Sequence, residues 1–212
     1  MSGALDFLSP SLARDDGGFH PVARSAVERL YAAAGATFEE RDNWRVAVSV
    51  PGEAEALQTV GIADVSHLGK LEVRPASAAT DESVQPSVAR STVYRLSPRR
   101  ALVFFPEAAR PSVLAAVAGA DVVLDVTAAY SVLAVSGPEA RTLVGRLTHL
   151  HHFPSGGEVA HVTAHVLPAG GGYRIVVAQE LGHYLAEVAV DCAAALGGGL
   201  VGVDAVPEGE QP

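Results

Sequence analysis

Two aspartates recur in the same short pattern and are the first residues in the chain that could do chemistry. Asp64 begins Asp-Val-Ser and Asp125 begins Asp-Val-Thr, each after a short apolar run and before an alternating one. A symmetric pair of carboxylates facing one pocket could act as general acid and base. The same pattern more often caps turns, because Asp, Ser and Thr side chains bond turn amides locally. We therefore expect two repeats of strand, tight turn and strand, and assign no catalytic residue.

Histidines are the next candidates, because imidazole is a common zinc ligand. Five of the eight histidines fall within a short span: His149, His151, His152, His161 and His165. If 159–167 is one strand, the last two share a face but lie about 13 Å apart at roughly 3.3 Å per residue, too far to bind one ion. No Cys or Glu stands near them at a recognised ligand spacing. We predict loop and surface histidines and no metal site.

Other kinds of catalytic site lack their sequence signatures. The chain has no Gly-x-Ser-x-Gly elbow, phosphate loop or dinucleotide fingerprint. Gly197-Gly-Gly199 follows a predicted helix, where glycines act as a helix stop. Cys192 is the single cysteine and lies among alanines, which favours a packing role over a nucleophile.

Composition and charge narrow the classes of partner. The chain has 212 residues, is 49% hydrophobic and 18% charged, and carries a net charge of −9. This length suits one large domain or two small packed ones. An acidic chain argues against binding to nucleic acids or to anionic membranes. No apolar run approaches the roughly 18 residues of a membrane span, and the start of the chain lacks a basic, apolar leader, so we predict a cytoplasmic protein.

Hydrophobic spacing predicts the elements that must position these residues. Residues 1–20 show no periodicity and are expected to form a flexible arm. The predicted elements of the first half are a helix over Pro21–Ala34, a hairpin of Ala36–Phe38 with Trp44–Val50, a short helix over Pro51–Val60, the first repeat, a hairpin of Thr92–Leu96 with Ala101–Phe105, and a helix over Pro106–Ala118. Between them, the polar segment Arg74–Ser87 is a candidate lid loop.

The second half follows the same logic. Its predicted elements are the second repeat, a helix from Gly137 that buries Ala140, Leu143, Val144 and Leu147, a loop with Pro154 and Gly156-Gly157, a hairpin of Val159–Leu167 with Tyr173–Ala178, a helix over Glu180–Leu196, and a closing strand over Leu200–Val206. A short tail, 207–212, ends the chain. Hairpins alternating with helices predict an α+β fold with mostly antiparallel sheets. The internal repeat predicts one unit over 21–206, with halves of about 21–120 and 121–206.

The repeats belong to a longer order of motifs, which consists of Gly35–Phe38, Trp44–Val46, Val60–Val73, Val93–Ser97, Asp125–Thr127, Ser136–Ala140 and Gly172–Val177, within about residues 20–205. This order of motifs resembles the folate-binding aminomethyltransferase superfamily. This superfamily includes the glycine cleavage system T-protein, domains of dimethylglycine and sarcosine dehydrogenases, and the gamma subunit of heterotetrameric sarcosine oxidase.

The resemblance implies a fold, a cofactor and a kind of partner. The family fold has two related β-rich subdomains with flanking helices around a central pocket. Its cofactor is tetrahydrofolate. A full T-protein continues into a further C-terminal domain for which this chain has no room, so in size it is more similar to the sarcosine oxidase gamma subunit. The implied partner is a larger flavin-dependent amine oxidase subunit, with a homo-oligomer as the other arrangement left open.

Three segments depart from the family pattern. Val88–Ser91 replaces an acidic, Gly-rich segment whose carboxylate helps to hold tetrahydrofolate, and Arg74–Ser77 replaces a Gly-x-Asp-Ala helix start. In Gly170–Arg174, Arg174 replaces a carboxylate expected to accept hydrogen bonds from the pterin ring. A cation cannot accept them, which implies a loss on the order of 1–3 kcal/mol in pterin recognition.

Two functions therefore follow from the resemblance. The first is a non-catalytic subunit of a folate-linked amine oxidase system, similar to the sarcosine oxidase gamma subunit. The alternative is a diverged tetrahydrofolate-binding aminomethyltransferase, whose pocket would use Tyr94, Tyr130, Tyr173 and Arg174. In that alternative, Arg174 would pair with the glutamate tail of the folate.

Overall fold

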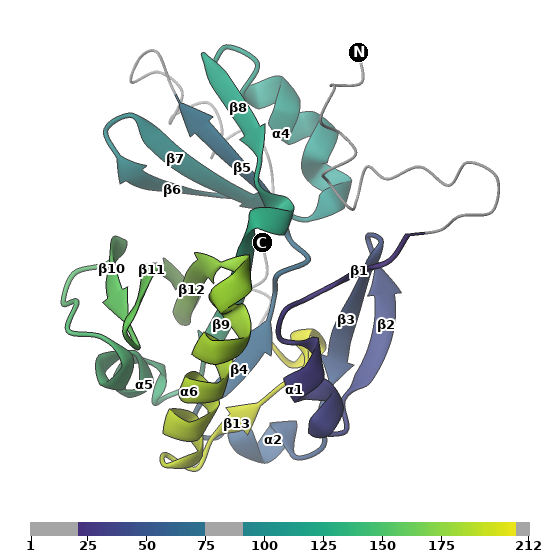
Figure 1. Cartoon of the computed structure of the whole chain (residues 1–212), viewed down its shortest axis with the longest axis vertical. Helices are drawn as coiled ribbons and strands as arrows, with labels where there is room; N and C mark the ends of the chain where they lie inside the picture. The colour runs from purple at the N-terminus through teal and green to yellow at the C-terminus, as the bar shows by residue number, and fades with distance from the viewer. Residues whose placement is uncertain (1–20, 75–90, 207–212) are drawn as a thin grey trace.

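The computed structural model describes residues 21–74 and 91–206. The predicted arm over 1–20, most of the candidate lid, the residues Val88–Arg90 and the tail over 207–212 lie outside these residues. Figure 1 shows three sheets, with the four-stranded sheet and its helix α4 above the other two.

Among the strands that the structure describes, six form the largest sheet, in the order β10-β11-β12-β9-β4-β13. Their bounds are Ser155–Val159 for β10, Val162–Ala169 for β11, Gly172–Ala178 for β12, Tyr130–Ser136 for β9, Gly61–Asp64 for β4 and Gly199–Leu200 for β13. All neighbours pair antiparallel except β13 with β4. The strand β12 therefore lies in the interior of this sheet.

The other strands in the described ranges form two smaller sheets. The four-stranded sheet has the antiparallel order β6-β7-β5-β8, with bounds Thr92–Ser97, Arg100–Phe105, Gly69–Arg74 and Val122–Asp125. The three-stranded sheet has the order β1-β3-β2, with bounds Ala23–Arg24, Trp44–Ser49 and Thr37–Arg41. In this sheet β1 and β3 are parallel.

Helices cover the outer faces of these sheets (Figure 1). The α-helices are α1 over Glu28–Ala33, α2 over Glu53–Ala56, α4 over Arg110–Ala116, α5 over Ala140–Leu147 and α6 over Gly182–Ala194. The 3₁₀ turns are η3 over Glu107–Ala109, η4 over Thr127–Ala129, η5 over Gln179–Leu181 and η6 over Val203–Ala205. None of the helices in the described ranges is long and apolar enough to cross a membrane.

The two sequence repeats connect the two larger sheets. In the first repeat the chain leaves the six-stranded sheet on β4 and enters the four-stranded sheet on β5. In the second repeat it leaves the four-stranded sheet on β8 and returns on β9. Because β4 pairs with β9 and β5 pairs with β8, the two crossings lie side by side and run in opposite directions. We call these two crossings, β4 to β5 and β8 to β9, the joint of the fold.

Two apolar clusters sit on opposite faces of the six-stranded sheet. One lies beneath α5 and α6 and includes Ile175 and Val177 of β12. The other takes residues from all three sheets, including Trp44, Phe104 and Val176. Residues that alternate along β12 therefore face either the helices or the space between the sheets.

Most predicted elements are confirmed. The α+β class, the strand-turn-strand repeats, the hairpins of 37–49 and 92–105 and the last long helix all form. The four residues expected to be buried on α5 are each no more than 6% exposed. Asp42 and Asn43 form the turn between β2 and β3, with φ of 53° and 61°, a conformation that these two residue types tolerate. The division of 21–206 into two halves stays a prediction.

Three local predictions were wrong. The helix expected over Pro21–Ala34 begins only at Glu28, because Ala23 and Arg24 pair with β3 instead. The loop expected around Gly156-Gly157 is the strand β10, which turns at Ala160-His161 into β11. The closing strand is only Gly199–Leu200, followed by a 3₁₀ turn. In the first two cases, pairing with another strand outweighed the local pattern.

Candidate functional site

The two Asp-containing turns cap themselves and each other. Asp64 accepts a hydrogen bond from the Ser66 amide at 3.1 Å, and Asp125 accepts one from the Thr127 amide at 2.9 Å. The Ser66 hydroxyl in turn accepts a hydrogen bond from the Val132 amide at 2.9 Å. The turn-capping interpretation of both aspartates is therefore confirmed.

The two carboxylates differ in their surroundings. Asp125 accepts a hydrogen bond from Nη1 of the buried Arg110 at 2.6 Å. Asp64 lies in the opposite crossing, where burial raises the pKa of its carboxyl against hydrogen bonds from Ser25 and Ser66 and the charge of Lys70, which lower it. An ion pair on one side and a desolvated carboxyl on the other do not make a symmetric acid-base pair.

Lys70 lies between these turns and was missed by the sequence reasoning. It is 0% exposed, and its ammonium donates hydrogen bonds to the Ser66 carbonyl at 2.7 Å and the Leu68 carbonyl at 2.9 Å. Burial lowers the pKa of Lys70 to about 7, although Asp64 and Asp125 raise it. The signal was present, since Lys70 is the only lysine in the sequence. It stands in an alternating strand where a charged residue is uncommon.

His67 follows the first turn and is kept neutral. Burial, with smaller contributions from the charges of Lys70 and Arg41, lowers the pKa of its imidazole to about 3, against the charge of Asp204, which raises it. Its buried Nδ1 has no hydrogen-bond partner in the described part of the chain. Arg41 and Asp204 form an ion pair at 2.5 Å. The joint thus combines a neutral imidazole with a buried amine.

Arg174 and Tyr94 come together in the space between the sheets. Arg174 is 1% exposed, and its guanidinium carbon lies 5.5 Å from the centre of the Phe104 ring. Tyr94 packs edge-on against the same ring at 5.7 Å and donates a hydrogen bond to the Pro168 carbonyl at 2.6 Å. Burial raises the pKa of Tyr94, while the nearby Arg174 lowers it.

The other two predicted site residues lie elsewhere. Tyr130 borders the same interior at the start of β9, where its hydroxyl accepts a hydrogen bond from Arg100 at 2.9 Å. Tyr173 precedes Arg174 on β12 and therefore points to the opposite face, beside the cluster beneath α5 and α6. The structure thus brings Tyr94, Tyr130 and Arg174 to one side and leaves Tyr173 on the other.

The interior around Arg174 does not fit the pterin ring of tetrahydrofolate. The pterin NH groups need an acceptor, and a guanidinium offers only donors. Its neighbours are also closely packed, since Leu102, Phe104 and Leu167 are each 0% exposed. A ring entering here would have to displace buried apolar side chains as well as Arg174.

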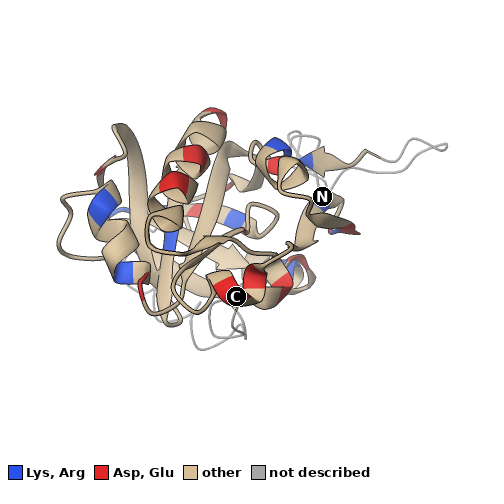
Figure 2. Ribbon diagram, turned by 90° about the horizontal axis from the view of Figure 1, so that it is seen from below, with Lys and Arg blue, Asp and Glu red and all other residues tan. Residues whose placement is uncertain are grey.

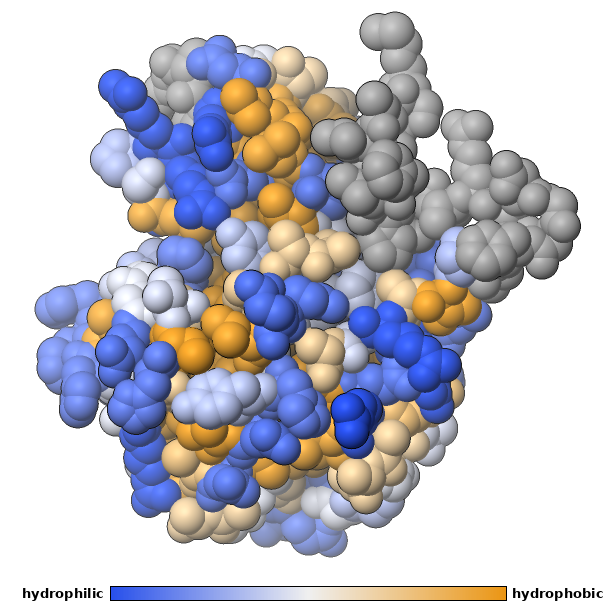
Figure 3. Space-filling model, viewed as in Figure 1, coloured by the Kyte–Doolittle hydropathy of each residue, from blue (hydrophilic) through white to orange (hydrophobic). Residues whose placement is uncertain are grey.

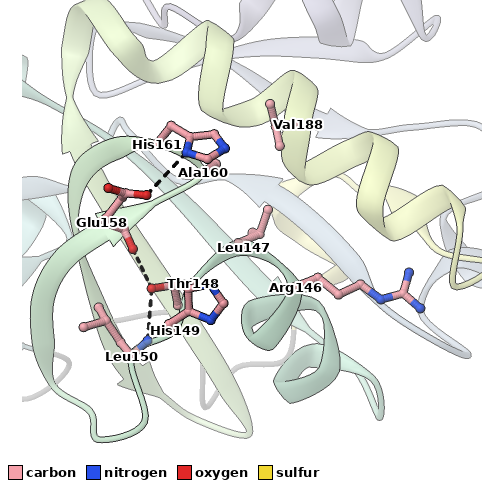
Figure 4. A pocket seen from close by; sticks show the side chains of 9 residues that line it. All are labelled: Arg146, Leu147, Thr148, His149, Leu150, Glu158, Ala160, His161 and Val188. Carbon is pink, nitrogen blue, oxygen red and sulfur yellow. Dashed lines mark hydrogen bonds and ion pairs between the residues drawn. The ribbon is translucent and has the colours of Figure 1, made fainter.

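A groove of about 560 Å³ lies outside the joint, between α5, α6 and the β10–β11 turn (Figure 4). His149 and His161 lie at its edge, and His161 pairs with Glu158 at 3.3 Å. Thr148 donates a hydrogen bond to the Glu158 carbonyl at 2.6 Å, so the polar groups of the groove largely satisfy one another. Within the described ranges, no cluster of three or more His, Cys, Asp or Glu residues could hold a metal ion.

No protein-family model matches the chain, and neither does any curated protein. Solved structures match at the level of the fold. One is a chain of heterotetrameric sarcosine oxidase from Corynebacterium sp. U-96, with 19% identity over 82% of this chain and 96% of that one, and a TM-score of 0.59. Another is glycine cleavage system aminomethyltransferase T from Bartonella henselae, with 18% identity and a TM-score of 0.63.

The chain has an aminomethyltransferase-like fold. The match to the Bartonella aminomethyltransferase covers 87% of this chain but only 60% of that protein. The match to the sarcosine oxidase chain covers 82% of this chain and 96% of that one. The fold class and the resemblance expected from the sequence are therefore confirmed.

Proposed function

We propose that this chain is a non-catalytic subunit that assembles with a larger flavin-dependent amine oxidase chain. The observation that carries the proposal is the coverage of the comparisons. The aminomethyltransferase-like fold of this chain matches 96% of one chain of a heterotetrameric oxidase, but only 60% of a free-standing transferase. The length of this chain therefore fits an oxidase subunit better than a complete transferase.

The chemistry of the joint supports the same proposal. Arg174 stands where the family pattern has a carboxylate, and it is buried against Phe104. Asp125 is engaged by Arg110, and Asp64 by its own turn. The residues that a transferase would use for folate are thus either replaced or committed to holding the fold.

An apolar surface on the four-stranded sheet is a suitable place for the oxidase partner to dock. Leu124 of β8 is 41% exposed on the face of the sheet away from α4, because its neighbour Val123 packs with the cluster beneath α4. Figure 3 shows apolar surface over β8 in the upper part of the molecule. Among the described strands, β8 is also an edge of its sheet, and an edge strand is a position where a partner can add a further strand.

Purification of the tagged chain from its native cells at endogenous levels tests the proposal. We expect a flavin-containing oxidase chain to co-purify, detected by mass spectrometry and by flavin absorbance. Leu124→Asp places a charge on the apolar surface and should abolish co-purification, while Thr163→Asp, at an exposed position of β11, should not. Recovery of the wild-type chain without an oxidase would contradict the proposal.

The second candidate function, a diverged tetrahydrofolate-binding aminomethyltransferase, rests on the TM-score of 0.63 to the Bartonella protein. It would use Tyr94, Tyr130 and Arg174 in the interior, with Arg174 facing the folate glutamate tail. Titration with tetrahydrofolate, followed by calorimetry or by the fluorescence of the single Trp44, tests it. An absence of binding at millimolar ligand would reject this function and leave the subunit proposal standing.

A further inference from the structure

A second cavity, of about 440 Å³, opens on the helix-covered side of β12. It is lined by Arg141 of α5, by the loop residues His151, His152 and Phe153, and by the β11–β12 turn with Tyr173. Because Tyr173 and Arg174 point to opposite faces of β12, this cavity is separate from the interior between the sheets. Its volume falls within the range of small-molecule sites.

Arg141 is the one formally charged side chain among the described residues that line this cavity, and its sign is opposite to the net charge of the chain. Arg141, His151 and His152 are all exposed at its wall, and none of the described residues that line it is Asp or Glu. The whole chain nevertheless carries a net charge of −9. In Figure 2 basic residues mark α5, whereas acidic residues mark α6. The groove beside Arg146 lacks this character, because Glu158 contributes an acid to it.

Two aromatic rings form the other wall. The Phe153 and Tyr173 rings pack at 5.2 Å with an angle of 69° between their planes. Nη1 of Arg141 lies 3.4 Å from the Tyr173 hydroxyl, which places the cation next to this wall. A guanidinium has five N–H donors, so most of them are left to bind a ligand. Gly170, Gly171 and Gly172 border the cavity without side chains that would fill it.

We propose that this cavity binds a small organic anion that carries both an oxyanion group and a planar ring. The oxyanion lies between Arg141 and the two histidines, because a guanidinium fork matches the geometry of phosphate and carboxylate oxygens. The ring lies against Phe153 and Tyr173, where aromatic faces and edges attract one another. This site is independent of the oxidase proposal and of folate.

Calorimetric titration of the full chain at one fixed pH tests the site with three probes. Adenosine monophosphate carries both ring and anion, inorganic phosphate carries only the anion, and adenosine carries only the ring. We expect saturable binding of adenosine monophosphate and clearly weaker binding of the other two. Arg141→Ala should lower the affinity for adenosine monophosphate by about tenfold or more, since it removes charged hydrogen bonds.

Arg146→Ala is the matched control, because Arg146 is also exposed on α5 but lines the other groove. This variant should bind adenosine monophosphate with the affinity of the wild type. The double variant His151→Ala with His152→Ala should also weaken binding, and circular dichroism checks that each variant is folded. No saturable binding of adenosine monophosphate or phosphate at millimolar ligand would overturn the proposal. Equal loss in both arginine variants would also overturn it. Equal affinity for phosphate and adenosine monophosphate would overturn the role of the aromatic wall.

Discussion

The Thr127 hydroxyl accepts a hydrogen bond from the backbone N–H of Lys70 at 3.0 Å, across 57 residues of sequence. The Ser66 hydroxyl accepts the equivalent bond from the Val132 amide, across 66 residues. Each repeat therefore holds the outgoing strand of the other through its turn hydroxyl. This reciprocal arrangement explains why the pattern Asp-Val-Ser/Thr occurs twice, and it assigns the pattern to the stability of the joint.

Thr127→Ala should lower the free energy of unfolding by about 1–3 kcal/mol, because it leaves the buried Lys70 amide without a partner. Thr127→Ser keeps the hydroxyl and should cost less. Thr163→Ala, at an exposed position of β11, is the control and should change little. Urea denaturation measures all three variants. An equal effect of Thr127→Ala and Thr163→Ala would contradict the reciprocal capping.

Lys70 should make stability depend on pH in a defined direction. Its folded-state pKa of about 7 lies below the ordinary 10.5, so between these values the unfolded chain binds more protons than the folded one. Stability should therefore rise with pH from about 7 to 10.5, with a slope of up to about 1.4 kcal/mol per pH unit from this group. In Lys70→Met this part of the slope should vanish. An unchanged slope in urea denaturation across this range would contradict the buried amine.

Arg174→Met should raise the pKa of the Tyr94 phenol. Burial already raises this pKa, and the nearby guanidinium opposes the effect, so its removal leaves burial unopposed. Ultraviolet titration of the phenolates measures the change, with Tyr94→Phe in both backgrounds identifying the Tyr94 contribution. A fall in the pKa, or no change, would show that Arg174 does not act on Tyr94.

Two glycines should respond to alanine in opposite ways. A methyl group at Gly202 would overlap the Val48 backbone, which cannot move aside as a side chain could, so Gly202→Ala should destabilise the fold strongly. Gly145 lies within α5 with nothing within 4 Å of an added methyl, so Gly145→Ala should stabilise by about 0.5–1 kcal/mol. Thermal denaturation compares the two. Similar effects of both variants would contradict the close approach of η6 to β3.

Prediction from sequence succeeded where the information is local. The alternation along Tyr130–Ser136 predicted a strand, and the apolar spacing on Ala140–Leu147 predicted the buried face of α5. It failed at Ala23–Arg24 and at Ser155–Val159, because each of these short strands forms only by pairing with another strand. A short segment has too little periodicity of its own to record such a pairing.

The candidate site was predicted only in part, for the same reason. The four residues assigned to a pocket were chosen by residue type, and tertiary structure placed Tyr173 on the face of β12 away from Arg174. The cavity around Arg141 brings together residues from a helix, a loop and a hairpin turn that no sequence spacing relates. The burial of Lys70 likewise depends on two turns 61 residues apart in the sequence, at Asp64 and Asp125.

By itself, the sequence determined the repeat, the α+β class and the type of fold, because strand alternation, turn chemistry and motif order are carried by neighbouring residues. Only the tertiary structure decided how the repeats join the two sheets, which carboxylate is paired, and which charged side chains are removed from water. Those outcomes depend on packing between strands far apart in the chain. Burial, in turn, sets the pKa values of Lys70 and His67.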